Sequence, residues 1–259
     1  MTVNQRVAPQ AFAEHIAHLV QVVPKDPEIS RAAGLFTKAL TAGGVIQAFG
    51  SGHSEAVAME IAGRAGGLVP TNRLALRDIV LYGDAPRADL DRYDLERDPA
   101  IARTILDLAP VQEHDLFVII SNSGVNGVVV ELATLVKERG HDLIAITSRA
   151  HSEAVASRHP SGRRLADLAD VVLDNHAPYG DAVLPLPPSG GGSTAPASIG
   201  AVSTITSALL AQLVVAQTVS NLLEAGEVPP VYLSANVPEG DAHNLRLEAL
   251  YAGRIRRTA

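Results

Sequence analysis

Apolar residues recur at helical spacing in some segments of the chain and form short unbroken runs in others. Helical spacing covers residues 8–22, which Pro24 ends, and residues 27–41, which Gly43 and Gly44 follow. Further helices are predicted over residues 54–65, 99–108, 124–139 and 151–158. Buried parallel strands are predicted from the apolar runs at residues 45–49, 116–120, 143–147 and 171–173. This alternation predicts an α/β fold around a parallel sheet with right-handed crossovers.

Two segments interrupt this alternation. Residues 84–100 are rich in Asp, Arg and Pro and are predicted to form a surface insertion. Residues 185–192, rich in Pro and Gly, are predicted to be a loop at the surface or beside an active site, with an interdomain linker as the alternative. Residues 199–224 then form a helix that is apolar almost all round, so we expect it to be buried in the core or in a subunit interface. Together with the N-terminal helices, it predicts a homodimer or homotetramer.

Length and composition fit one globular domain. The chain has 259 residues, of which 47% are hydrophobic and 19% charged, which excludes an intrinsically disordered protein. We therefore expect a single domain over residues 1–259, with an N-terminal helical extension over about residues 1–43 and a C-terminal helical segment over about residues 199–259.

Charge and cysteine content exclude several classes of protein. The 28 acidic and 21 basic residues give a net charge of −7, and the basic run at residues 254–257 is short, so no nucleic-acid partner is expected. The absence of Cys excludes disulfides, thiolate catalysis and Cys-ligated metals. Polar residues interrupt the longest apolar stretch, residues 197–223, and the N-terminus lacks the pattern of a signal peptide. A cytoplasmic protein with no membrane partner is therefore expected.

Hydroxyl-bearing residues follow three of the predicted strands. They lie in the segments Gly50-Ser51-Gly52-His53-Ser54, Ser121-Asn122-Ser123-Gly124-Val125-Asn126 and Thr147-Ser148. Because parallel strands end at one edge of a sheet, we expect these loops to meet there, and two of them lead into helix N-termini, which favour anions. Serine hydroxyls donate to phosphate oxygens, and glycines let the backbone approach a ligand. The pattern predicts a phosphate-binding site built without Lys or Arg.

The alternative for each loop is an ordinary helix N-cap, because Ser and Asn are common at that position. Three such loops on one sheet edge favour a ligand site over three independent caps. Two familiar phosphate-binding motifs do not account for the pattern. Glu55 stands where the dinucleotide-binding fingerprint has its last Gly, and the Gly-Lys-Ser/Thr of a P-loop does not occur.

These segments resemble those of a known family. Residues 49–54 and 120–124 are similar to the two signature loops of the sugar isomerase (SIS) domain, which occurs in phosphoheptose isomerase and in the isomerase half of glucosamine-6-phosphate synthase. Over about residues 10–255, the chain resembles in particular an uncharacterised bacterial group of stand-alone SIS proteins. This second resemblance is carried by residues 64–70, 148–152, 234–237 and 240–244.

The resemblance implies a flavodoxin-like, three-layer α/β/α sandwich with a five-stranded parallel sheet and added N-terminal helices. It also implies that Ser54, Ser121 and Ser123 bind the phosphate of a phosphosugar. The family pattern Ser-x-Ser-x-x-Ser/Thr ends here in Asn126, whose amide can still donate to phosphate. Ser148, on the third loop, is a further candidate for contact with the phosphate.

An isomerase of aldose and ketose phosphates needs a base that moves a proton between C1 and C2 and an acid that opens the ring. Glu60 is the candidate base, because it follows Ser54 by six residues in a small apolar stretch; the alternative is an ordinary helical pair with Arg64. His243 is the candidate acid–base group, because the resembled family often supplies a His from a neighbouring subunit. The alternative is that His243 and Asn244 cap the last helix.

Other polar residues near the predicted loops have weaker assignments. Ser51, Gly52, His53 and His151 are candidates for contact with the sugar, although His151 could instead cap the helix 151–158. The remaining histidines are expected at the surface, namely His15, His18, His114, His141 and His159. Two groups have spacings that suggest metal ligands, namely Asp174 with Asn175, His176 and Asp181, and Asp241 with His243. Neither forms a recognised metal pattern, so no metal or other cofactor is expected.

We therefore expect a phosphosugar-binding protein that interconverts an aldose and a ketose phosphate by proton transfer through an enediol. Two alternatives remain open at this point. The protein could be a phosphosugar sensor without catalytic activity, or a lyase or deaminase that acts on an aminosugar phosphate.

Overall fold

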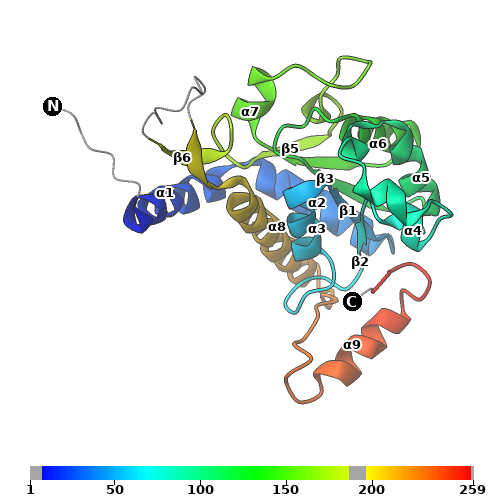
Figure 1. Cartoon of the computed structure of the whole chain (residues 1–259). Helices are drawn as coiled ribbons and strands as arrows, with labels where there is room; N and C mark the ends of the chain where they lie inside the picture. Colours follow the sequence, from blue (N-terminus) through cyan, green and yellow to red (C-terminus); the bar gives the residue numbers. More distant parts are fainter. Residues whose placement is uncertain (1–7, 187–196, 258–259) are drawn as a thin grey trace.

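The structure is a computed structural model that describes residues 8–186 and 197–257. Five parallel strands form one sheet in the order β2-β1-β3-β4-β5. The strands are β1 Ile46–Gly50, β2 Thr71–Leu74, β3 Leu116–Ile120, β4 Leu143–Thr147 and β5 Val171–Asp174. Helices cover both faces of the sheet (Figure 1), so the expected three-layer α/β/α sandwich is confirmed.

Alternating apolar side chains in the strands build two cores, one on each face of the sheet. In β3, Leu116, Val118 and Ile120 belong to one core, and Phe117 and Ile119 belong to the other. The first core is covered by α2 (Glu28–Thr41), α3 (Glu55–Ile61) and α8 (Ser203–Glu224). The second core is covered by α4 (Asp78–Leu81), α5 (Ala100–Leu108) and α6 (Gly127–Glu138).

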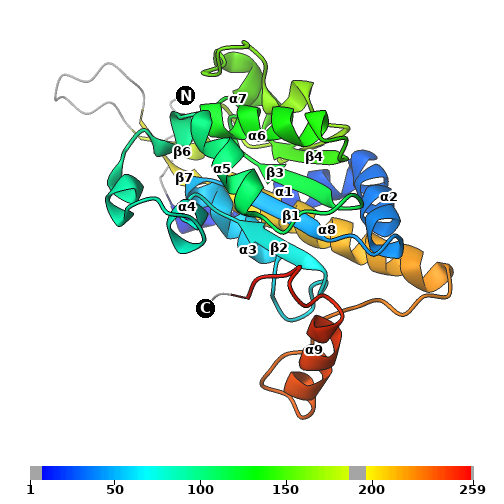
Figure 2. The ribbon, with the colours of Figure 1, turned by 90° about the vertical axis from the view of Figure 1, so that its right-hand side faces the viewer.

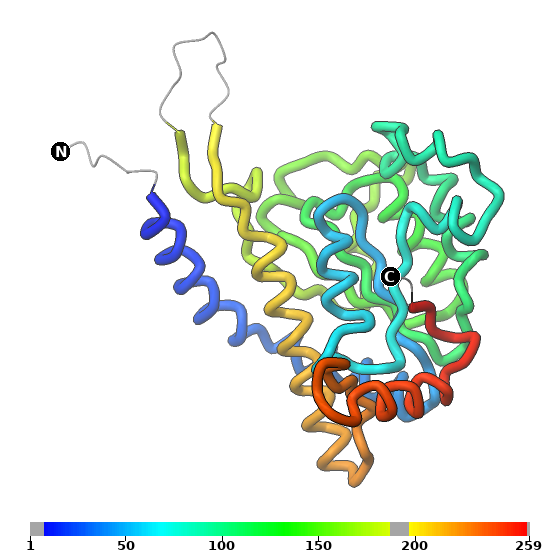
Figure 3. Tube along the Cα trace, turned by 60° about the horizontal axis from the view of Figure 1, so that its bottom comes forward, coloured from blue at the N-terminus to red at the C-terminus, as the bar shows by residue number. Residues whose placement is uncertain are grey.

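The remaining helices lie at the margins of this sandwich. Helix α1 (Pro9–Val22) runs beside α8, as Figure 3 shows, and α7 (Arg149–Ala154) follows β4. Helix α9 (Gly240–Ala249) projects from the main body (Figure 1). Its anchor is Tyr232, whose hydroxyl donates to Glu248 and accepts from Arg257, each at 2.7 Å. Burial raises the pKa of Tyr232 to about 12, so this hydroxyl remains a neutral donor.

Several element boundaries differ from those predicted. Helix α3 ends at Ile61 rather than at residue 65, because Ala62 is already extended (φ −108°, ψ 119°). Helices α6 and α7 are also shorter than predicted. Strand β7 (Ser198–Ala201) pairs with β6 (Ala182–Pro185) in an antiparallel ribbon, so the long helix begins at Ser203 rather than at residue 199. The rest of the predicted loop, residues 187–192, lies outside the described residues.

Helix α8 is not buried all round within one chain. Leu210 and Val214 face the core, whereas Ile205 and Leu223 on the other side are 43% and 60% exposed. Within residues 8–186 and 197–257, α8 is the one helix that is long and apolar enough to cross a membrane, and 44% of that stretch is buried inside the fold. Helix α8 packs one face against α2 and α3 and leaves the other exposed, as an outer helix of a layered α/β protein does.

The insertion at residues 84–100 is more than the surface segment that was predicted. It forms two short 3-10 helices, η3 (Arg87–Asp91) and η4 (Leu95–Arg97), and Leu95 is only 4% exposed in the core above α6. A Cβ atom on Gly127 would lie 2.1 Å from the carbonyl oxygen of Arg97, so only glycine permits this approach. The insertion is therefore packed firmly over the N-terminus of α6.

A chain of buried polar groups crosses the edge of the sheet where the strands begin. Asp115 accepts from the backbone N–H of Val45 and from the Gln47 side chain at 2.9 Å each, and from the Arg254 guanidinium at 2.5 Å. Gln47 in turn accepts from Asn72 at 3.2 Å. The buried side chains of Asp115, Gln47 and Asn72 thus each have a hydrogen-bond partner, as burial requires.

Two histidines depart from the predicted surface positions. His141 is buried, with Nδ1 3.0 Å from the carbonyl oxygen of Asp115 and its ring against Phe117. His159 is half-buried and lies 2.9 Å from Glu131. Both side chains have an apolar body and a polar tip, which allows them to fill gaps between helices.

The C-terminal segment covers β2 at the edge of the sheet (Figure 2). The backbone N–H of Arg256 donates to Asn72 at 2.9 Å. The Arg257 guanidinium donates to the carbonyl oxygens of Thr71 and Val69 at 2.9 and 2.7 Å. The two guanidinium bonds satisfy carbonyl groups at the start of the edge strand that would otherwise be left unpaired.

We predict that Asp115→Ala lowers the free energy of unfolding by about 3–5 kcal/mol, because it leaves a buried guanidinium and buried N–H groups without their acceptor. Urea denaturation measures this change. Asp107→Ala is the control, because Asp107 pairs with Arg139 at the surface and should cost less than about 1 kcal/mol. Equal losses in the two variants would contradict the prediction.

Candidate functional site at the carboxyl edge of β1 and β3

The strand order places a crevice between β1 and β3. The chain leaves β1 toward β2 on one side, and β3, β4 and β5 follow on the other, so the order reverses at this point. Open α/β sheets bind ligands at such a switch point, beyond the carboxyl ends of the strands. Gly50 lies opposite Ile120 in the register, so the loops at residues 51–54 and 121–126 leave the sheet side by side.

The first loop turns tightly over the end of β1. A Cβ atom on Gly50 would lie 2.4 Å from the carbonyl oxygen of Ser54, so glycine is required for the chain to double back here. Ser51 and Ser54 are half-buried, and Gly52 and His53 are exposed. Ser51 Oγ donates to Glu96 at 3.2 Å. Within residues 8–186 and 197–257, the Ser54 hydroxyl has no hydrogen-bond partner.

The second loop presents hydroxyl and amide groups before α6. Ser121 Oγ accepts from the N–H of Gly124 at 3.1 Å and keeps its own proton for donation. The half-buried Ser123 makes no side-chain hydrogen bond to the described residues. Asn126 stands at the N-cap position, where its amide donates to Glu96 at 3.0 Å and its oxygen accepts from Arg158 at 3.3 Å. Arg158 is a cation beside the loops that the sequence analysis did not anticipate.

The third loop adjoins the second, because the Thr147 hydroxyl and the Ser148 N–H both donate to the carbonyl oxygen of Asn122, but the Ser148 hydroxyl is engaged elsewhere. Ser148 is fully buried, and its hydroxyl donates to the carbonyl oxygen of Ala177 at 2.6 Å. The same oxygen accepts from the N–H of His151 at 3.0 Å, so Ser148 is the N-cap of α7, which was the alternative for each loop. His151 accepts from the N–H of Gly180 at 2.9 Å and stacks against Tyr179.

A small polar cavity beside the first loop includes residues that the sequence analysis did not select. Its polar lining comes from Ser54, Asn122, Asn175, Ser203, Thr204 and Ser207. Asn175 is buried and donates to both Asn122 and Ser207 at 3.1 Å. The hydroxyl groups in the first turns of the otherwise apolar helix α8 were the sequence signal for this wall of the cavity.

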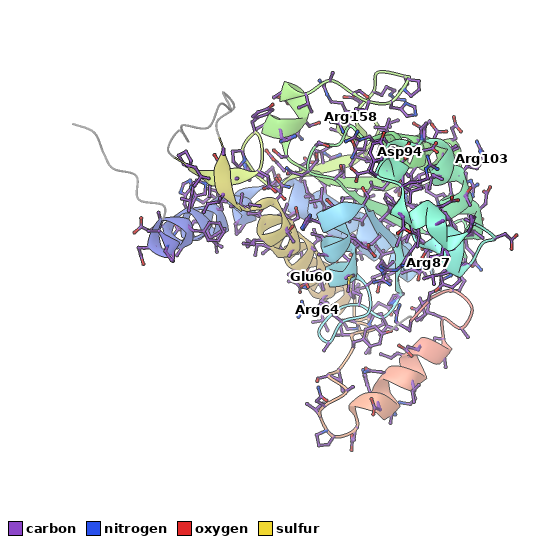
Figure 4. The ribbon with its side chains drawn as sticks, in the orientation of Figure 1. Glu60, Arg64, Arg87, Asp94, Arg103 and Arg158 are labelled. Carbon is purple, nitrogen blue, oxygen red and sulfur yellow. The ribbon has the colours of Figure 1, made fainter. Side chains whose placement is uncertain are left out.

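Glu60 makes the pair with Arg64 that was the alternative to its role as a base. It forms the ion pair with Arg64, and it also accepts from Gln212 of α8 at 2.7 Å. The Glu60 side chain is 22% exposed. Figure 4 shows Glu60 on α3 close to Arg64, which follows the end of this helix, and both lie away from Asp94 and Arg158.

His243 does not lie at the serine loops of its own chain. It is in the first turn of α9, where its Nε2 donates to the carbonyl oxygen of Val231 at 2.9 Å. The segment before α9 pairs with the chain after α3, through Tyr232 and residues Gly66 and Gly67. Ser54 stands at the opposite end of α3. Helix α9 itself begins after Glu239, without a side-chain cap from His243.

The acidic groups that suggested metal ligands have structural partners instead. Asp174 accepts from the N–H groups of Arg149 and His176, and Asp181 accepts from the N–H and hydroxyl of Ser203 at the start of α8. Within the described parts of the chain, no group of three or more His, Asp or Glu side chains is arranged to hold a metal ion.

A larger cavity, of about 480 Å³, lies on the far side of α3. Its charged lining consists of Arg64, Arg73, Asp78, Arg256 and Arg257. Arg64 pairs with Glu60, and the two C-terminal arginines bind backbone carbonyl groups. Burial raises the pKa of Asp78. The serine loops do not line this cavity, so its size does not make it the site of the chemistry predicted from them.

Comparisons with known proteins agree with this architecture. The sequence model of the SIS domain family matches residues 11–148, more than half of the chain. A UPF0309 protein of Geobacillus thermodenitrificans is 36% identical over 227 residues, which cover 88% of this chain and 87% of that protein.

Solved structures show the same fold. A proposed phosphosugar isomerase involved in capsule formation from Bacteroides fragilis superposes with a TM-score of 0.53 at 20% identity, covering 83% of this chain and 89% of that one. Phosphoheptose isomerase from Neisseria gonorrhoeae gives a TM-score of 0.50 at 21% identity, covering 82% and 98%. The matched sequence model and the 36% identical relative establish that this chain belongs to the SIS domain family and to the UPF0309 proteins.

Proposed function

We propose that this protein binds a sugar phosphate at the two serine loops and interconverts its aldose and ketose forms. The observation that carries the proposal is the adjacency of these loops at the β1–β3 switch point, with the Ser54 and Ser123 hydroxyls free of partners in the described residues. Membership of the SIS domain family supports it, as does the shared fold with proteins described as phosphosugar isomerases.

The proposed phosphate site consists of neutral donors. Ser54, Ser121 and Ser123 each have a hydroxyl proton to donate, and Asn126 has an amide. The helix α6 begins directly after Asn126 and adds the positive end of its dipole next to this loop. Together they would hold a doubly charged phosphate with the partial charges of aligned dipoles, in a protein whose net charge is −7.

The isomerase step requires a carboxylate that takes a proton from C1 or C2 of the open-chain sugar and returns it to the other carbon through an enediol. We assign this role to Glu60. Gln212 holds its carboxylate at 2.7 Å, and Arg64 is the adjacent cation. Both groups donate to the carboxylate and fix its position, and a carboxylate oxygen can accept a proton from the sugar.

The proposal includes a second copy of the chain, because His243 is distant from the serine loops of its own subunit. Its Nε2 donates to the carbonyl oxygen of Val231, and Nδ1 makes no hydrogen bond to the described residues. Apolar side chains of α9 and of the residue after it are exposed, namely Leu245 and Leu250, as is Leu223 at the end of α8. We infer that this surface packs against another subunit and presents His243 to it.

We predict a homodimer or homotetramer in solution at micromolar concentration, measured by light scattering. The exposed apolar side chains near α9 would then be covered. A monomer would contradict this prediction and would also remove His243 from the proposed site.

We predict that the double variant Ser54→Ala, Ser123→Ala binds sugar phosphates at least about tenfold more weakly, because each lost hydroxyl donates to a charged oxygen. Isothermal titration calorimetry measures the affinity. Ser30→Ala, at an exposed position on α2, is the control and should bind as the wild type does. Unchanged affinity in the double variant would overturn the proposed phosphate site.

We predict that Glu60→Gln lowers kcat by about 10²–10⁴-fold with little change in ligand affinity, because the amide cannot accept the proton. Turnover is followed across a panel of aldose and ketose phosphates. Arg64→Gln is the control, because it breaks the same ion pair but keeps the carboxylate. Equal losses in both variants would reduce the role of Glu60 to the ion pair. Binding by the wild type without any turnover would indicate a sensor rather than an isomerase.

A further inference from the structure

The insertion over α6 places one acidic side chain directly between the two serine loops. Glu96, in η4, accepts from Ser51 Oγ at 3.2 Å with one oxygen and from the Asn126 amide at 3.0 Å with the other. A Cβ atom on Gly52 would lie 3.9 Å from the first oxygen. The carboxylate therefore bridges the loop after β1 and the loop after β3.

The backbone around Glu96 is fixed by packing. Leu95 is buried in the core beside it, and the carbonyl group of Arg97 lies against Gly127 at the start of α6. On the far side, Asp98 caps the first N–H of α5 by accepting from Ala100 at 3.1 Å. The segment that carries Glu96 is thus part of the folded core, and its carboxylate is held in place before any ligand binds.

The partners of Glu96 are neutral. Among the described residues, no Lys, Arg or His forms an ion pair with it, and the nearby Arg158 binds the oxygen of Asn126 instead. An ionised carboxylate has about four acceptor positions, and two donors leave the others open. A half-buried carboxylate without a cation is costly unless another donor arrives.

A phosphate group cannot be that donor, because it is an anion and would be repelled at short range. The hydroxyl or ammonium groups of a sugar can donate to a carboxylate, and bonds of this kind are among the stronger ones in proteins. The two ends of a sugar phosphate therefore suit different parts of the site. The phosphate suits Ser54 and Ser123, and the hydroxyl or ammonium groups of the sugar suit Glu96.

We propose that Glu96 is a specificity-determining residue, which accepts a hydrogen bond from a hydroxyl or ammonium group of the sugar and so selects sugar phosphates over free phosphate. This inference rests on the proposed function, and it adds the recognition of the sugar itself to that of the phosphate.

The test compares the affinities of the wild type and Glu96→Gln for fructose 6-phosphate, glucosamine 6-phosphate and inorganic phosphate, by isothermal titration calorimetry. We expect the variant to bind the better sugar phosphate about tenfold more weakly or worse, because a charge-assisted hydrogen bond is lost. Its affinity for inorganic phosphate should be unchanged or higher, because a nearby negative charge is removed. A loss confined to glucosamine 6-phosphate would identify an ammonium group as the donor, and a similar loss for both sugars a hydroxyl.

Asp94→Asn is the matched control. Asp94 lies in the same insertion and pairs with Arg92 at the surface, so the substitution removes one charge without touching the loops. We expect it to bind all three probes as the wild type does. If Glu96→Gln does not fold, Glu96→Asp provides the same comparison, because it keeps the charge but withdraws the carboxylate from the sugar.

Three results would overturn the proposal. Tighter binding of sugar phosphate and free phosphate alike by Glu96→Gln would mean that Glu96 merely fills the phosphate position. Equal weakening for all probes would mean that it only supports Ser51 and Asn126. Unchanged affinities would mean that the ligand does not contact it. A wild type that binds no sugar phosphate would overturn the proposed function itself, which distinguishes that failure from the other three.

Discussion

The parallel pairing of β1 with β3 is the constraint on which the site depends. It sets Gly50 opposite Ile120, so two loops separated by about seventy residues of sequence leave the carboxyl edge of the sheet at the same level. Neither loop contains a charged residue between Ser51 and Ser54 or between Ser121 and Asn126, and each needs its neighbour to form a concave surface. The chemistry of the site is therefore a property of the strand order, and the individual loops supply only its donors.

The electrostatics of this edge follow from how few formal charges it contains. Hydroxyl, amide and helix N–H groups can orient toward an anion without the desolvation cost of a buried cation. Glu96 accepts from the nitrogen of the Asn126 amide, and Arg158 donates to its oxygen. One amide group therefore separates a positive from a negative side chain. A ligand with an anionic end and a hydrogen-bond-donating end complements this arrangement better than a simple anion does.

The sequence was sufficient to predict the strands that are buried on both faces of the sheet. β3 and β4 are unbroken apolar runs because both faces of a central parallel strand are covered. β2 was missed because it is an edge strand with Thr, Asn and Arg, and its polar groups find partners in residues distant in the sequence, such as Gln47 and Arg256. Ser148 shows a different limit, since a serine before a helix has the same local sequence whether it caps the helix or binds a ligand. Glu96 was overlooked because its neighbours are charged, and only the buried Leu95 and the close approach at Gly127 reveal that this segment belongs to the core.

The arginines that bind β2 carry a consequence for how the protein can be handled. Arg257 binds the backbone carbonyl groups of Thr71 and Val69 at the start of the outer strand, and Arg256 binds the Asn72 side chain, so the two cover an edge that another polypeptide could otherwise use for pairing. A fusion partner or affinity tag joined directly to this end would compete with those bonds, and proteolytic trimming there would leave the strand bare. Self-association of trimmed material would then have its origin in an unmasked β-edge and would not report on the native assembly.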